Sequence, residues 1–254
     1  VFDWLGQYGW SYGVVILILT LIIKICLMPI AFKSYMSSAK MRVLKPEIDA
    51  INEKYPKQED AMKKQQAIMD LYKKADASPM SGCLPMLLQF PILIAIFRFF
   101  PSSIELRQQS FLWADDLSTY DSILDLPFNI PFYGDHVSLF TLLMTASTLL
   151  YTYINNKQMK QAQGDQAMPG MTLMLYLMPI IFLGVFNSYS AGLSYYYLLV
   201  NLFSFLQMYI FKISINEDRL RRQIEQAKKK PVKKSNFQKR LEEMQRQQQQ
   251  QMRR

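Results

Sequence analysis

Histidine and cysteine are scarce in this chain of 254 residues, and their scarcity excludes several classes of enzyme. With His136 as its one histidine, the chain has no HExxH zinc motif and no serine–histidine pair within its apolar segments. Those segments also lack aspartate, which excludes an aspartyl protease inside a membrane. A glycine-rich phosphate-binding loop is absent as well. We therefore expect a protein that is not an enzyme and that has neither a metal nor a cofactor.

Charge is missing from five long stretches of the chain, apart from a few isolated residues. These stretches are 14–32, 82–104, 137–154, 168–186 and 191–213. Each approaches or exceeds the roughly 20 residues that a helix needs to cross a bilayer. The period-two alternation of barrel strands is absent. The sequence predicts an all-α polytopic membrane protein with five transmembrane helices, in which Cys26 and Cys83 are small buried thiols rather than a disulfide.

The charged residues between these stretches predict the orientation of the helices. Residues 33–76 carry ten Lys/Arg and seven Asp/Glu, whereas residues 105–136 carry one basic residue and six acids. Residues 212–254 carry fourteen basic and five acidic residues. Because basic loops stay in the cytoplasm, we expect the N-terminus and 105–136 outside and the C-terminus inside.

Lys24 is the charged residue in the first apolar stretch. A cation near the middle of a membrane helix costs about 2.5–3.5 kcal/mol, and such side chains usually face a bundle interior or a water-filled cavity. The alternative is a lysine that snorkels to the inner surface, but about 12 Å of helix separates Lys24 from Phe32. We favour the polar cavity.

Other polar residues fall at similar depth in the predicted helices. We expect Gln89, Asn201 and Gln207 to share a hydrophilic cavity with Lys24. For Thr145, Ser147 and Thr148 we favour ordinary hydrogen bonding between helices.

The segments outside the predicted membrane helices have their own patterns. Residues 1–12 hold five aromatic residues and are predicted to lie at the outer surface, as are the aromatic residues of 105–136. Residues 34–79 show apolar residues at helical spacing and predict a cytoplasmic helical hairpin, with Pro46 kinking or restarting its first arm. Residues 213–254 form a basic tail, for which the alternatives are binding to ribosomal RNA, binding to anionic lipid headgroups, or no specific binding. Its basic residues include Arg219, Arg221, Arg222, Lys228, Lys229, Lys230, Lys233 and Lys234.

Four local motifs, in this order, resemble those of the YidC-type membrane protein insertases. They are AKMRVLKP (39–46), GCLPMLLQFP (82–91), ELRQ (105–108) and GLSYYYLLVN (192–201). The resemblance covers nearly all of residues 10–212. It implies a five-helix insertase core at 13–212, in the inner membrane of a Gram-negative bacterium, preceded by further sequence. It also implies a positively charged groove, open to cytoplasm and lipid, that receives the polar outer segment of a nascent membrane protein.

The resemblance also implies roles for single residues. Lys24 occupies the place of the family's groove arginine, and Thr20 and Tyr197 match positions that line the groove. Phe90 and Pro91, next to Gln89, match the substrate-facing edge of the second membrane helix. Implied partners are nascent membrane proteins, the ribosome, the Sec translocon, the signal recognition particle system and the lipid bilayer.

A small-solute transporter or channel is the alternative from a different class. The sequence shows no inverted repeat, and five membrane helices do not divide into equal halves. Solute flux in liposomes would distinguish the two functions, because an insertase is expected to show none.

Overall fold

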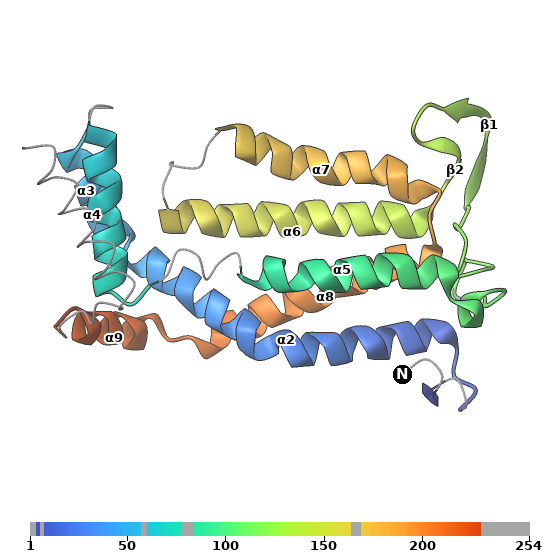
Figure 1. The fold of residues 1–254 in the computed structure, drawn as a ribbon, viewed down its shortest axis with the longest axis horizontal. Coiled ribbons are helices and arrows are strands. Elements are labelled where there is room, and N and C mark those ends of the chain that lie inside the picture. Colours follow the sequence, from blue (N-terminus) through green and yellow to red (C-terminus); the bar gives the residue numbers. More distant parts are fainter. Residues whose placement is uncertain (1–3, 6–7, 57–59, 78–83, 164–168, 230–254) are drawn as a thin grey trace, which may run out of the picture.

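Five helices that lie side by side set the long axis of the molecule (Figure 1). They are α2 (Tyr12–Val43), α5 (Leu84–Ser102), α6 (Leu139–Gln163), α7 (Pro169–Asn187) and α8 (Ala191–Ser214). The structure is a computed structural model that describes residues 4–5, 8–56, 60–77, 84–163 and 169–229. Each of the five apolar stretches corresponds to one of these helices, so the predicted helical fold class is confirmed at that level.

Two helices extend beyond the apolar stretches that predicted them. α2 continues without a break to Val43, with Pro29 inside it, and α6 continues to Gln163. Cys26 is exposed on α2, so its predicted burial is wrong. The reason is that α2 is apolar on nearly all sides, whereas only one side of it packs against other helices; Cys83 lies outside the described residues.

Length and composition qualify α2 and α8, among the described helices, to cross a membrane. Leu87–Ser102 of α5 and Thr172–Asn187 of α7 are apolar but shorter. All five helices nevertheless expose large apolar side chains, among them Ile25, Phe90, Leu150, Ile181 and Leu206. Such surfaces are typical of helices that face lipid rather than water.

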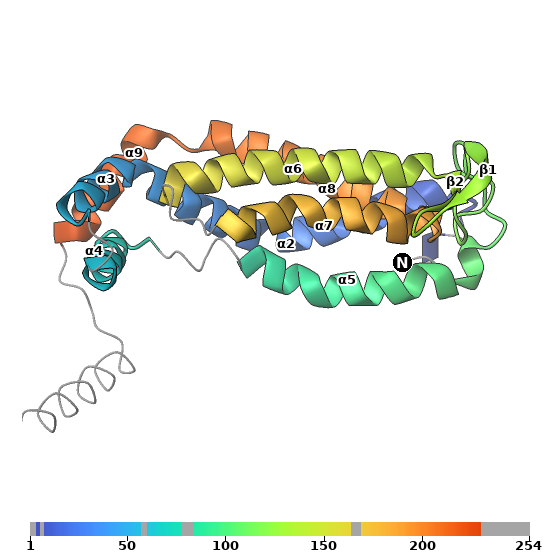
Figure 2. The same ribbon diagram turned by 90° about the horizontal axis from the view of Figure 1, so that it is seen from above.

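α8 lies at the centre of the helix packing. It packs against α2 and α6, and α6 also packs against α7. α5 contacts α2 and α8 less extensively and lies at one edge of the bundle when the molecule is seen from above (Figure 2).

One end of the bundle carries three shorter helices, and we call it the helix-cluster end. They are α3 (Lys45–Lys54), α4 (Ala61–Lys74) and α9 (Glu217–Lys229). Pro46 stands in the first turn of α3, as predicted, where its missing N–H costs nothing. The three helices share a core with the end of α2, formed by Leu44, Ile48, Ile68, Tyr72, Leu220 and Ile224. Apolar residues that repeat at helical spacing in 34–79, such as Ile48 and Ile68, are thus buried as the spacing indicates, whereas Met62 and Met69 are exposed. α9 adds a third helix to this core.

The opposite end carries an antiparallel β-hairpin, and we call it the hairpin end. β1 (Leu124–Ile130) pairs with β2 (Gly134–Val137), and the short helix η3 (Ile104–Leu106) follows α5. The sequence did not predict these strands. His136, expected in an external loop, is buried: its ring stacks on Tyr120 at 3.9 Å between centroids and its Nε2 lies 2.9 Å from the Asn187 carbonyl oxygen.

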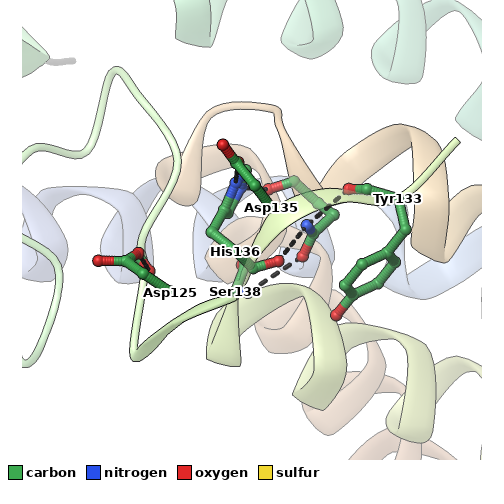
Figure 3. Close-up of polar contacts among 7 residues, drawn as sticks. Asp125, Tyr133, Asp135, His136 and Ser138 are labelled. Carbon is green, nitrogen blue, oxygen red and sulfur yellow. Dashed lines mark hydrogen bonds and ion pairs between the residues drawn. The ribbon is translucent and has the colours of Figure 1, made fainter. Parts of the chain in front are cut away.

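The side chain of Asn187 joins the hairpin to the end of α7. Its amide nitrogen donates to the carbonyl oxygens of Tyr133 and His136, both at 2.8 Å, and its amide oxygen accepts the Ser138 N–H at 3.0 Å (Figure 3). Asn187 is fully buried, so each of these bonds replaces a contact with water that the fold has removed.

The buried carboxylate of Asp121 caps the N-terminus of α6. It accepts the N–H groups of Leu139 and Phe140 at 2.9 and 3.1 Å, the Trp113 indole N–H at 2.9 Å and the Ser138 hydroxyl. The Ser138 hydroxyl oxygen in turn accepts the Thr141 N–H at 3.1 Å. The N–H groups that begin every helix lack partners within it, so these bonds satisfy donors that would otherwise be buried and unpaired.

Replacing Asp121 by alanine is therefore expected to destabilise the protein strongly. Loss of a buried cap and of a charged acceptor costs about 2–4 kcal/mol, which corresponds to a fall in Tm of roughly 5–10 °C. The measurement is thermal unfolding in mild detergent. Asp125→Ala, which removes an exposed carboxylate of the same segment, is the matched control and is expected to change stability by under about 0.5 kcal/mol. Equal effects of the two variants would contradict the role of Asp121.

Candidate functional site

The apolar core of the bundle fills only the half nearest the hairpin end. In α2, no apolar side chain is buried between Ile16 and Tyr35, and in α8 none is buried between Leu199 and Phe211. Both helices are described over their whole length. The half of the bundle nearer the helix-cluster end therefore lacks the tight apolar packing of the other half.

Lys24 lies in this loosely packed half, at the contact between α2 and α8. Its ammonium group donates to the Ser204 hydroxyl at 2.6 Å, and that hydroxyl donates to the Val200 carbonyl oxygen at 2.7 Å. The Gln207 amide donates to the Lys24 carbonyl oxygen at 3.3 Å. No acidic side chain pairs with Lys24 among the salt bridges of the described residues. The cation therefore keeps hydrogen-bonding capacity and an unneutralised charge.

Three buried polar atoms on α5 and α8 make no hydrogen bond of ordinary geometry. They are Nε2 of Gln89 on α5 and the hydroxyl groups of Tyr196 and Tyr197 on α8. Each such group costs about 1–3 kcal/mol in an apolar surrounding, so a native fold keeps it only for a reason such as contact with water or a ligand. Gln89 and Tyr197 were predicted as site residues, whereas Tyr196 was not.

Thr20 and Asn201 are engaged in hydrogen bonds within the bundle. The Thr20 hydroxyl donates to the Ile16 carbonyl oxygen at 2.7 Å, and its side chain is fully buried. The Asn201 amide donates to the hydroxyls of Ser147 and Thr148 on α6, at 2.9 and 2.8 Å. The structure thus confirms helix–helix hydrogen bonding for Ser147 and Thr148, and it directs Asn201 to α6 rather than to Lys24. For Thr145 the prediction is wrong, because its buried hydroxyl has no hydrogen-bond partner among the described residues.

Phe90 and Pro91 are exposed on α5, the helix at the edge of the bundle. Leu87 and Ile94, about one turn away on either side, are exposed as well. These side chains make α5 an apolar surface beside the polar Gln89. Arg98, nearer the hairpin end of the same helix, is exposed.

The basic residues of the tail divide into two groups. Arg219, Arg221, Arg222 and Lys229 are exposed on α9, while Lys228 forms an ion pair with Glu47 of α3. Leu220 and Ile224 hold α9 in the core at the helix-cluster end, which leaves the arginines facing outward. Lys230, Lys233 and Lys234 lie outside the described residues.

Ser204 is a candidate site residue that reasoning from the sequence missed. Ser204 follows Tyr197 by seven residues and precedes Gln207 by three, so helical spacing places all three near one face of α8. That spacing was a usable signal.

The bonds between Asn201 and α6 lead to a prediction about stability. Interhelical hydrogen bonds in membrane proteins average about 0.6 kcal/mol and reach about 1.7 kcal/mol. We expect Asn201→Ala to lower the free energy of unfolding by roughly 1 kcal/mol. In the background Ser147→Ala/Thr148→Ala the same change should cost much less, because its acceptors are gone. Unfolding in detergent is measured for the wild type, for Asn201→Ala, for Ser147→Ala/Thr148→Ala and for all three changes combined. Additive effects on the free energy of unfolding would contradict hydrogen bonding between Asn201 and these two hydroxyls.

Comparison with known proteins identifies the family. The family model described as 60Kd inner membrane protein matches residues 4–219. A curated membrane protein insertase YidC of Parabacteroides distasonis is 55% identical over 100% of this chain and 40% of its own length. The YidC proteins of Bacteroides fragilis and Amoebophilus asiaticus are 57% and 49% identical, over 98% and 96% of this chain and 41% and 40% of their own lengths. The chain thus spans about 40% of the length of these relatives. With its apolar helices and these matches, the chain belongs to the 60Kd inner membrane protein family, the bacterial family of the YidC insertases.

Proposed function

We propose that this chain is the insertase core of a bacterial inner-membrane protein that inserts nascent membrane proteins and helps them to fold. The names of the relatives support this function, since they match nearly the whole chain at about half identity. Insertion of this kind needs no covalent chemistry. The protein lowers the cost of moving a polar segment through the apolar layer by offering polar partners along the way.

The observation that carries the proposal is the unpaired charge of Lys24 in the loosely packed half of the bundle. Lys24, Ser204 and Gln207 meet at the contact of α2 with α8, and Gln89 and Tyr197 bring further polar groups without partners. We place these groups along a hydrophilic groove that opens toward the helix-cluster end. An acidic outer segment of a client would gain a charge partner there that lipid cannot supply.

The apolar surfaces beside these groups suit the other part of a client. Phe90 and Pro91 on α5, together with Leu202 and Leu206 on α8, are exposed large or rigid side chains. The hydrophobic segment of a client would leave the groove along these faces and enter lipid without crossing a polar barrier. α5 suits this role because it packs least extensively against the other helices.

The charges at the two ends support an orientation in the membrane. The helix-cluster end holds α3, α4 and α9 with their many Lys and Arg residues, and the hairpin end contains the acidic segment 105–136. By the positive-inside rule the helix-cluster end lies in the cytoplasm, and five helices cross the bilayer. The exposed arginines of α9 then face the cytoplasm, where the ribosome, the Sec translocon and the signal recognition particle system are the partners that we propose.

The charge of Lys24 provides the direct test of the groove. Lys24→Ala is expected to reduce insertion of a small single-span client with an acidic outer segment by about tenfold or more, because about 1.4 kcal/mol of lost attraction gives that factor. Lys24→Arg keeps the charge and should retain insertion. The measurement is insertion of this client in cells depleted of the native protein and complemented with each variant.

A client whose outer segment carries no charge serves as the matched control. Its insertion should change little in Lys24→Ala, since it offers nothing for the cation to attract. If Lys24→Ala inserts the acidic client as well as the wild-type protein does, charge attraction in the groove is disproved.

Hydration of the groove can be tested independently of insertion. In a background of Cys26→Ala and Cys83→Ser, Ser204→Cys is expected to react with a water-soluble maleimide, because this side chain lies beside the Lys24 ammonium group. Leu202→Cys is the matched control: it lies two residues away, on an exposed apolar part of α8, and should stay unlabelled in lipid. The extent of labelling in membrane vesicles is measured by mass shift, and equal labelling at both positions would argue against a groove.

A further inference from the structure

The turn of the β-hairpin contains a residue that neither the helix packing nor the proposed groove explains. The Tyr133 N–H donates to the Ile130 carbonyl oxygen at 3.0 Å, so Ile130, Pro131, Phe132 and Tyr133 form a β-turn. Phe132 occupies the third position with a φ of 67°. A positive φ at this position is usual for glycine or asparagine, and it costs a bulky residue about 1–2 kcal/mol.

The ring of Phe132 is also exposed over 98% of its surface. Phe128, which lies in an irregular part of β1 between the pairs Asp125–His136 and Ile130–Gly134, is 60% exposed. Residues 126–134 contain no charged side chain. Asp125 lies at the base of the hairpin, opposite His136, and Asp135 directly follows Gly134, which pairs with Ile130. The tip is thus an uncharged surface that carries two exposed aromatic rings.

Two contacts with α7 fix the depth of this tip. The Phe132 carbonyl oxygen lies 2.5 Å from the place where a Cβ on Gly184 would stand, so this close approach requires glycine there. The Tyr133 carbonyl oxygen accepts the Asn187 amide at 2.8 Å. Gly184 lies three residues, or about 4.5 Å, inside the end of α7. The turn is therefore held beside the last turn of α7, next to the exposed apolar side chains of Ile181 and Val185.

We propose that the hairpin tip, through Phe132 and Phe128, inserts into the interfacial region of the outer lipid leaflet. Phe132 has two costs that glycine would avoid: backbone strain at a positive φ and exposure of an apolar ring. A partner that covers the ring would offset them. Lipid fits as that partner because the tip continues the apolar surface of α7, and because aromatic rings favour the boundary between headgroups and hydrocarbon. The hairpin would then fix the outer end of α7 at a defined depth in the membrane.

Nitroxide labels at single cysteines test this proposal. The full-length protein containing this chain, with Cys26→Ala and Cys83→Ser, is reconstituted into phosphatidylcholine–phosphatidylglycerol vesicles. Phe132→Cys and, as an independent position, Phe128→Cys are labelled, and collision with oxygen is compared with collision with a water-soluble nickel chelate. We expect the ratio of oxygen to nickel collisions at both positions to be several-fold higher than at Asp125→Cys, the matched control near the base of the hairpin.

Three results would overturn the proposal. A ratio at both tip positions equal to that at Asp125→Cys would place the tip in water. Labels shielded from both reagents would show that another protein surface, rather than lipid, covers the tip. Ile181→Cys on α7 serves as a reference, because the tip proposal rests on the bundle lying in the bilayer as proposed above. If the label at Ile181→Cys lies in water, both the placement of the bundle in the bilayer and the insertion of the hairpin tip are rejected. If that label lies in lipid while the labels at the tip lie in water, only the insertion of the tip is rejected.

Discussion

The bonds at the hairpin end are the constraint on which the rest of the bundle depends. Asp121 and Asn187 each satisfy several backbone groups that come from segments far apart in the sequence. They fix where α6 begins and where α7 ends, and Ser190 at the start of α8 is tied to the same region through the Leu117 carbonyl oxygen at 2.7 Å. Since three helix ends are held at one place, the helices can separate toward the other end without losing their order.

This arrangement divides the bundle into a tightly packed half and a polar half. Large buried side chains such as Phe100, Phe140 and Tyr196 fill the space near the hairpin end. Farther along α2 and α8, the contacts between helices pass through Lys24, Ser204 and Gln207 instead. A polar half of this kind would be unstable if the helix ends were free. The dense hairpin end supplies the stability, and the polar half supplies the function that we propose.

The sequence predicted the parts of this structure that depend on local pattern. Long apolar runs predicted the five helices, and apolar spacing predicted the buried faces around Ile48 and Ile68. The β-hairpin was missed because its first strand contains Pro127 and does not alternate, and because its turn and second strand are held by Asn187, which lies about 50 residues farther along the chain. Lys24 could be chosen as a candidate site residue because it is a charge within an apolar stretch of sequence. The partner of Asn201 could not, because it depends on how α8 is rotated relative to α6.

The unbroken course of α2 has a mechanical consequence. One helix carries Lys24 in the polar half and Met41 in the core of the helix-cluster end, about 25 Å farther along its axis. A force applied to the helix-cluster end would therefore be transmitted along α2 to the Lys24 region. Pro29 lies between the two and cannot donate the backbone hydrogen bond that would brace this turn. Bending is thus easiest about one and a half turns from Lys24, where a small tilt of the cluster would change the spacing of α2 and α8.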